Sequence, residues 1–133
     1  MIIFILFFLI TGTINANATV VDRVLDGDTV EIKNPTPPKE ILMTKHRLAG
    51  IDTPESLKQF AKCEKEIILG LKAKEFTKNF VKGEVEIIYI ETDKYGRYLI
   101  NIRKNDRDLA EELVKSGLAY FYDGGTKIKN WCN

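Results

Sequence analysis

One long helical pattern interrupts a chain that is otherwise made of short β-rich segments. Residues 64–82, EKEIILGLKAKEFTKNFVK, repeat apolar side chains near the period of an α-helix, with lysines between them. Gly83 follows where such a helix would end. The positions expected to face the core are Ile67, Ile68, Leu71, Phe76 and Phe80. The pattern divides the chain into a β-rich part before the helix and another after it.

Three strands are predicted before the helix. Residues 19–33 are rich in β-branched side chains and are split by Asp26-Gly27, a strong hairpin signal, which indicates two paired strands. Residues 34–40 contain three prolines and predict a loop. Residues 41–51, ILMTKHRLAGI, predict the third strand.

Two strands and a short helix are predicted after it. Residues 84–91 alternate as a strand and pair across TDKYG with residues 98–103. Asp108 can cap a second helix that ends at Gly117. This order of three strands, a helix, two strands and a helix predicts an α+β fold. The expected architecture is a five-stranded OB-type barrel with a helix after strand 3 and a short C-terminal helix.

The first 18 residues, MIIFILFFLITGTINANA, are expected to be a signal peptide. They carry no charged side chain, their apolar run is too short to span a bilayer, and they end in Ala-Asn-Ala. No Lys or Arg precedes the run, so an uncleaved anchor or a different start remains an alternative. We expect residues 19–133 to be a single exported domain, periplasmic or secreted, with no stable membrane association and a monomeric state.

The charge of this domain is nearly balanced. All 20 basic and 19 acidic side chains lie after residue 18. Proteins that bind the phosphate backbone of nucleic acids usually have a basic excess. Any attraction for phosphate must therefore be local.

Cys63 and Cys132 are the two cysteines of the chain. In an oxidising compartment they favour a disulfide that fastens the C-terminal end to the middle of the chain, and two unrelated buried thiols are the alternative. Closing a loop of nearly 70 residues would add roughly 4 kcal/mol to stability in the chain-entropy description.

Three polar segments each have a purely structural interpretation. Residues 26–29, DGDT, could be only a hairpin turn; residues 52–55, DTPE, could be only a helix start; residues 93–97, DKYGR, could be only a hairpin loop. Together they contain the groups that phosphodiester hydrolysis requires at one place.

The charged residues of these segments, together with Arg47 five residues before Asp52, divide into three roles. Asp28 and Asp52 offer hard oxygen ligands for a divalent cation, and Glu55 offers a carboxylate that can orient or deprotonate water. Arg47 and Arg97 can neutralise charge on phosphorus, since a guanidinium stays charged and holds two phosphate oxygens.

The segments VLDGDTVEI, HRLAGIDTPE and DKYGRYLINI, in this order and spacing, resemble the signature segments of the staphylococcal nuclease (thermonuclease) family. The resemblance runs from about Thr19 to Tyr122. It implies an OB-fold endonuclease that depends on Ca²⁺ and cleaves DNA and RNA, with single strands preferred and 3′-phosphate ends as products. It also implies that the Thr53 backbone carbonyl is a calcium ligand beside Asp28 and Asp52.

Nucleotide contacts follow from the same resemblance. Lys94 and Tyr95 lie in the third segment, where Tyr95 matches a tyrosine that stacks on the nucleotide in the family. Tyr122, with Tyr120 as an alternative, stands in for a second such tyrosine. The chain departs from the family pattern after residue 119, so these assignments depend on how the tail folds.

Two other functions compete with the nuclease. An OB barrel could bind single strands without cutting them, but this gives no reason for three carboxylates beside phosphate. A structural calcium-binding domain explains the carboxylates and leaves Arg47 and Arg97 without a role. His46 adjoins Arg47, but alternation along the strand points it the other way, which favours a packing or surface role over catalysis.

Overall fold

The computed structural model describes residues 18–37, 43–127 and 129–133. Nearly all of the expected signal peptide, the end of the predicted loop (38–40) and the first two residues of the expected third strand (41–42) lie outside this part. Within it, no helix combines the length and apolar character that a membrane crossing requires. The elements are β1 (Ala18–Val20), β2 (Arg23–Asp26), β3 (Thr29–Glu31), β4 (Lys45–Leu48), β5 (Ile51–Asp52), α1 (Glu64–Phe80), β6 (Glu84–Thr92), β7 (Tyr98–Lys104), β8 (Arg107–Asp108), α2 (Leu109–Lys115) and β9 (Tyr120–Phe121).

Most strands belong to one curled sheet. Its order is β1-β6-β7-β4-β3-β2, with β8 on β7, and β5 pairs separately with β9. The first and last strands of this order, β1 and β2, are separated in the chain by only Val21 and Asp22. The sheet therefore curls until its two edges meet at this short segment, as in an OB-type barrel.

The predicted α+β architecture is confirmed, and the strands are more broken than expected. The first predicted strand is β1 followed by β2, and the third is β4 followed by β5. Gly50 separates β4 from β5 with a φ of +76°, a conformation that favours glycine. β8 and β9 were not anticipated, because two-residue strands leave no periodicity to read.

Helix α1 buries only part of the face that was expected: Phe80 is buried and Phe76 packs against the core, as predicted. Its buried residues are Glu66, Gly70, Ala73, Thr77 and Phe80. Ile68 and Leu71, which were predicted to face the core, are about half exposed, at 50% and 51%. The reason is close approach: a Cβ atom on Gly70 would stand 2.5 Å from the carbonyl carbon of Glu55. Small side chains let the helix backbone touch the loops beneath it.

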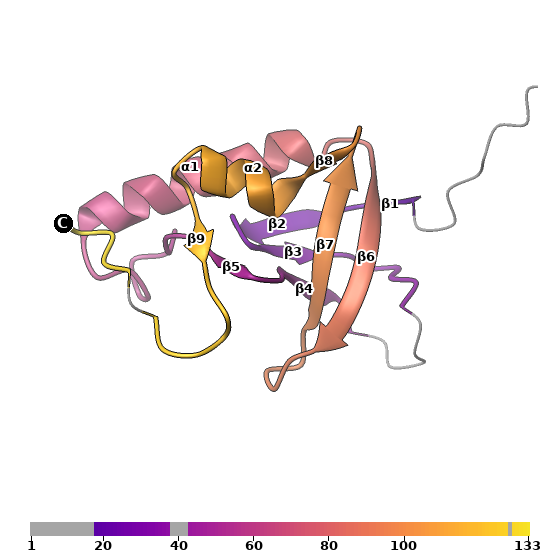
Figure 1. Ribbon diagram of the computed structural model, residues 1–133, viewed down its shortest axis with the longest axis horizontal. Helices are drawn as coiled ribbons and strands as arrows, with labels where there is room; N and C mark the ends of the chain where they lie inside the picture. The colour runs from indigo at the N-terminus through magenta and orange to yellow at the C-terminus, as the bar shows by residue number, and fades with distance from the viewer. Residues whose placement is uncertain (1–17, 38–42, 128) are drawn as a thin grey trace, which may run out of the picture.

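Helix α2 lies beside α1 over the sheet, in front of α1 in Figure 1. Asp108 caps it as predicted, since its Oδ1 accepts a hydrogen bond of 3.1 Å from the Glu111 N–H. The core between the helices and the sheet includes Val30, Leu48, Ile51, Ile87, Ile100, Ile102, Leu109 and Leu113.

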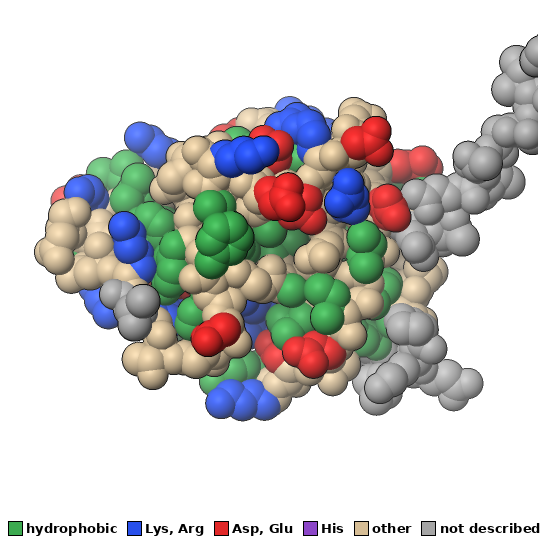
Figure 2. Space-filling view, viewed as in Figure 1, with side chains coloured by type: hydrophobic (Ala, Val, Ile, Leu, Met, Phe, Trp, Pro, Cys, Tyr) green, Lys and Arg blue, Asp and Glu red, His purple; other side chains and the backbone are tan. Residues whose placement is uncertain are grey.

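The surface mixes charges of both signs. On the face shown in Figure 2, Lys and Arg side chains alternate with Asp and Glu, with apolar side chains between them. On this face the mixture matches the nearly neutral composition of the chain.

Candidate active site

Two turns bring the acidic residues together. Asp28 lies in the turn between β2 and β3, and Asp52 ends β5; both are buried, at 7% and 4% exposed. The Thr53 backbone N–H donates to Asp28 Oδ2 at 3.1 Å, which ties the second turn to the first. No helix begins at residues 52–55, so a mere helix start is excluded there, and α1 begins at Glu64.

Arg47 connects the two buried carboxylates. Its Nη2 lies 3.4 Å from Asp28 Oδ2 and 3.1 Å from Asp52 Oδ1, and its Nη1 donates to the Leu48 carbonyl at 3.2 Å. The register of β4 explains this, because Arg47 pairs with Thr29, next to Asp28. One guanidinium is thus held by three partners at the base of the acidic group.

Glu55 stands at the open side of this group. Its side chain is 31% exposed, and its Oε1 lies 3.7 Å from Lys127 Nζ. Burial raises the pKa of Glu55 above its ordinary value, and the charges of Asp26, Asp28 and Asp52 raise it further, against the lowering effect of Lys127. Glu55 is therefore partly buried among carboxylates whose charges oppose its ionisation.

Asp26 belongs to the same group, although the sequence presented it only as a turn residue. Burial raises the pKa of Asp26, and the charge of Asp28 adds to this against a hydrogen bond from Ser56 Oγ. That bond joins Asp26 to the segment that carries Glu55.

Helix α1 supports both turns from behind. Thr77 Oγ1 donates to the Gly27 carbonyl at 2.6 Å, and a Cβ atom on Gly27 would meet Ala73 Cβ at 2.7 Å. Gly70 packs on the Glu55 and Ser56 backbone in the same way. The helix therefore fixes the positions of both acidic turns through direct contact with their main chains.

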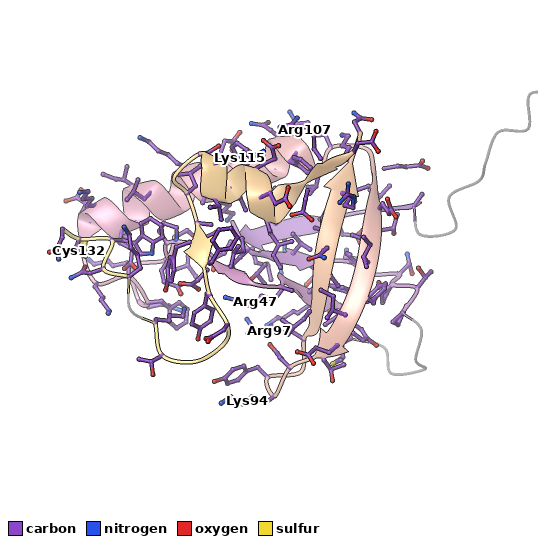
Figure 3. All side chains as sticks on the ribbon, viewed as in Figure 1. Arg47, Lys94, Arg97, Arg107, Lys115 and Cys132 are labelled. Atoms are coloured by element: carbon purple, nitrogen blue, oxygen red, sulfur yellow. A yellow bond between two sulfur atoms is a disulfide. The ribbon has the colours of Figure 1, made fainter. Side chains whose placement is uncertain are left out.

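Arg97 lies on the same side of the sheet as Arg47. Arg47 pairs with Leu99 in the parallel β4–β7 register, so Arg97, two residues earlier, continues on the same face. Figure 3 shows Arg47 and Arg97 close together in projection, with Lys94 further out on the β6–β7 loop. Among the described residues, however, the carboxylate partner of Arg97 is Asp93, whose Oδ2 lies 2.8 Å from Arg97 Nε.

The β6–β7 loop presents an exposed aromatic ring between cations. Tyr95 is 71% exposed, with Lys94 Nζ 5.3 Å and Arg97 Cζ 5.4 Å from its ring centre. Burial of Asp93 raises its pKa, but hydrogen bonds from the Arg97 and Tyr95 backbone and from the Arg97 side chain outweigh this and lower the pKa overall. The loop is thus braced by Asp93, while Tyr95 is left free to stack.

The C-terminal tail also borders the acidic group. β9 pairs with β5, placing Tyr120 opposite Asp52 in the register, and the Tyr122 N–H donates to the Gly50 carbonyl at 2.9 Å. The ring of Tyr122 lies 5.7 Å from Arg47 Cζ. Tyr122 therefore borders the acidic group beside Arg47, and the hydroxyl of Tyr120, the alternative candidate, is buried.

The predicted disulfide is confirmed. Cys63 and Cys132 are bonded, with their Cα atoms 6.0 Å apart, and Figure 1 shows the C-terminus beside the start of α1. Trp131 is buried at 9% exposed, with its ring 5.8 Å from that of Tyr120. The tail is fastened at both ends.

Lys127, like Asp26, joins the group without having been predicted from the sequence. Its Nζ lies 3.0 Å from Asp52 Oδ1 and 3.7 Å from Glu55 Oε1. Partial burial lowers the pKa of Lys127, but the hydrogen bond and charge of Asp52 outweigh this and raise it overall. No local pattern singles out this lysine, since only the folded tail brings it to the carboxylates.

His46 is a core residue. It is fully buried, donates from Nδ1 to the Thr44 carbonyl at 2.7 Å, and packs on the rings of Tyr89 and Tyr98. Burial lowers its pKa, so the neutral form is favoured. The prediction that it faces away from Arg47 is confirmed by its burial on the other face.

The donor atoms of the acidic group suit a hard divalent cation. The two carboxylates of Asp28 and Asp52 and the main chain of Thr53 meet at one place, and Thr53 Oγ1 is buried with no hydrogen-bond partner in the described chain. No three His, Cys, Asp or Glu side chains of the described residues form a ready cluster for a metal. A cation held here would need further oxygen ligands from water or substrate.

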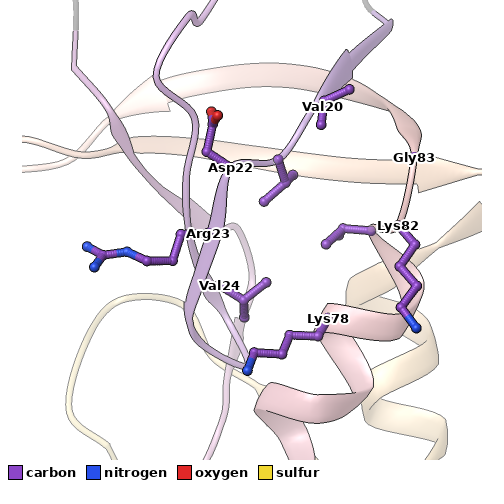
Figure 4. Close-up of a pocket in the computed structure, with 9 residues that line it drawn as sticks. Val20, Asp22, Arg23, Val24, Lys78, Lys82 and Gly83 are labelled. Carbon is purple, nitrogen blue, oxygen red and sulfur yellow. The ribbon is translucent and has the colours of Figure 1, made fainter.

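A hollow elsewhere on the molecule takes no part in this arrangement. Figure 4 shows it between β2 and the C-terminal end of α1, where Arg23, Lys78 and Lys82 surround apolar side chains such as Val24. No predicted site residue lines it. The candidate site is instead the open surface between the two acidic turns, the β6–β7 loop and the tail.

Several known proteins are similar to this chain in sequence. The family described as staphylococcal nuclease homologue matches residues 45–130. An uncharacterised 38.1 kDa protein of Capnoides sempervirens is 34% identical over 115 residues, which is 82% of this chain and 29% of that protein. An uncharacterised endonuclease of Escherichia coli is 30% identical over 103 residues, 76% of this chain and 58% of that protein.

A third relative is matched over more of its length. The thermonuclease of Staphylococcus intermedius is 31% identical over 121 residues, 87% of this chain and 67% of that protein. The chain spans less than two thirds of the length of the first two relatives, so shared sequence covers only part of those proteins.

Proposed function

The chain belongs to the staphylococcal nuclease family, and on that basis we propose that it is an endonuclease that hydrolyses phosphodiester bonds in DNA and RNA with Ca²⁺ as its cofactor. The observation that carries the proposal is the Arg47 guanidinium shared by two buried carboxylates with Glu55 beside them. A binding module or a structural domain has no use for this combination of opposed charges inside one pocket.

Each residue of the group has a chemical task in this proposal. The carboxylates of Asp28 and Asp52 and the Thr53 carbonyl would hold a calcium ion, which when bound would supply positive charge for the scissile phosphate. Glu55 accepts the proton of the attacking water, and it is the only one of these carboxylates at the open side of the pocket. Arg47 meets the negative charge that grows on the phosphate oxygens in the transition state.

The second arginine approaches from another element. Arg97 shares the face of Arg47, and its attachment to Asp93 keeps it at the edge of the site. A phosphate that enters between the two arginines would replace carboxylate contacts with phosphate contacts. This supports a role for Arg97 in binding the substrate.

Aromatic side chains at two edges favour single strands. Tyr95 and Tyr122 border the site from the β6–β7 loop and from the tail. Unpaired bases can stack on such rings, with Lys94 available for a neighbouring phosphate. We propose preference for single-stranded substrates, 3′-phosphate products, and action as a monomer exported from the cell.

One assay tests the activity. The purified protein is incubated with single-stranded DNA and RNA in calcium or in chelator, beside Glu55→Gln and, as a control, Glu75→Gln on the exposed surface of α1. Cleavage that requires calcium, persists in the control and falls at least about 100-fold in Glu55→Gln supports the proposal. Binding without cleavage would favour the single-strand binding module. Calcium uptake without affinity for DNA would favour the structural domain.

A further inference from the structure

One carboxylate oxygen of the acidic group already has two positive side chains beside it. Asp52 Oδ1 lies 3.0 Å from Lys127 Nζ and 3.1 Å from Arg47 Nη2. A metal ion bound at the same oxygen would stand only a few ångströms from both positive groups. Repulsion at that separation is strong, so at least one of them has to move when a metal binds.

Exposure identifies which of the two moves. The Arg47 side chain is 11% exposed and is held by three acceptors in the fold, whereas the Lys127 side chain is 48% exposed. Lysine carries its charge on a flexible four-carbon stem and regains full hydration once it swings into water. Displacing the Lys127 side chain from the carboxylates therefore costs less free energy than displacing Arg47.

The tail delivers Lys127 to this position. On one side the chain is fixed by the pairing of β9 with β5, and on the other by the Cys63–Cys132 bond and the buried Trp131. The Tyr122 ring, 5.9 Å from Lys127 Nζ, gives the ammonium a second contact. The lysine is therefore a tethered cation with a high local concentration at the carboxylates.

We propose that Lys127 occupies the carboxylate pocket in the metal-free protein and competes with the divalent cation for Asp52. This rests on the proposed calcium-dependent function and adds to it a competitor that belongs to the same chain. The competition raises the calcium concentration at which the metal half-occupies the site, and hence the concentration at which the protein becomes active.

Calcium binding measured by titration calorimetry tests the proposal without reference to activity. Lys127→Met removes the competing charge, and Lys129→Met is the matched control, since it removes a lysine two residues away that lies over Trp131. From the typical strength of partly exposed ion pairs, calcium should bind Lys127→Met about threefold to fivefold more tightly than wild type. Lys129→Met and the charge-preserving Lys127→Arg should stay close to wild type.

Thermal unfolding gives an independent measurement. Without calcium, Lys127→Met should unfold at a lower temperature than Lys129→Met, because its carboxylates lose their counter-ion. Its stabilisation by added calcium should be the largest of the set. Equal calcium affinity in wild type and Lys127→Met, or equal gains in both lysine variants, overturns the competition while leaving the proposed nuclease intact. Failure of every variant to bind calcium overturns both.

Discussion

Gly70→Ala should damage the site from a position that touches no substrate. Gly70 lies inside α1, where replacing glycine with alanine ordinarily stabilises a helix by about 1 kcal/mol. Here the new Cβ would stand 2.5 Å from the Glu55 carbonyl carbon and oxygen and 2.7 Å from the Ser56 nitrogen. Carbon atoms pack at about 3.5 Å or more, so the helix and the Glu55 loop must separate by about 1 Å.

The change in the free energy of unfolding is then the sum of a packing cost and a gain in helix propensity. Overpacking of this kind costs about 1–3 kcal/mol, which exceeds the helix-propensity gain and leaves a net destabilisation of about 1 kcal/mol. Activity should fall much further, because a displacement of about 1 Å at a catalytic carboxylate can reduce the rate about 100-fold. The expected signature is a nearly normal fold with a severe loss of kcat.

The measurement pairs denaturant unfolding with calcium-dependent cleavage of single-stranded DNA. Lys72→Ala, on the exposed face of the same helix, is the control for a general effect of alanine on α1. If Gly70→Ala gained about 1 kcal/mol of stability and kept its kcat, the proposed support of Glu55 by the helix backbone would be refuted.

Three further predictions follow from contacts at and around the site. Arg47→Lys keeps the charge but loses the planar guanidinium that contacts both Asp28 and Asp52, so the cleavage rate should fall about 100-fold. The surface control Arg103→Lys should change the rate little. A small loss in Arg47→Lys would contradict the role proposed for this guanidinium. Burial lowers the pKa of His46 from its ordinary 6.5, so the unfolded chain takes up a proton first as the pH falls. Below pH 6.5 the free energy of unfolding of the wild type should therefore drop, relative to that of His46→Phe, by up to about 1.4 kcal/mol per pH unit. Parallel pH profiles of the two proteins in denaturant unfolding would argue against this. Reducing the Cys63–Cys132 bond should lower the free energy of unfolding by roughly 4 kcal/mol, measured with and without reductant. A loss below about 1 kcal/mol would contradict the chain-entropy account of its stabilisation.

The secondary structure was largely predictable because its signals are local. The Asp26-Gly27 turn between β2 and β3, the helix cap at Asp108 and the β6–β7 hairpin each depend on residues that are neighbours in the chain. Pairing of Cys63 with Cys132 was predictable for a different reason, since two cysteines allow only one intramolecular bond.

The inward face of α1 was only partly predictable from the hydrophobic period. The pattern correctly favoured Phe80, but it also favoured Ile68 and Leu71, which are about half exposed, while Gly70, Ala73 and Thr77 are buried. Periodicity detects where large apolar side chains fall, whereas this contact depends on the distance between two backbones. That distance is a property of the packed fold.

The candidate site, too, was predictable from the sequence only in part. The sequence by itself determined the kinds of groups present, Asp28, Asp52, Glu55 and two arginines, because chemistry restricts which side chains can bind cations and phosphate. Only the tertiary structure decided that Asp26 and Lys127 join them and that Arg97 is attached to Asp93. Charges act through space over a few ångströms, and which charges meet at that range depends on how distant segments of the chain pack together.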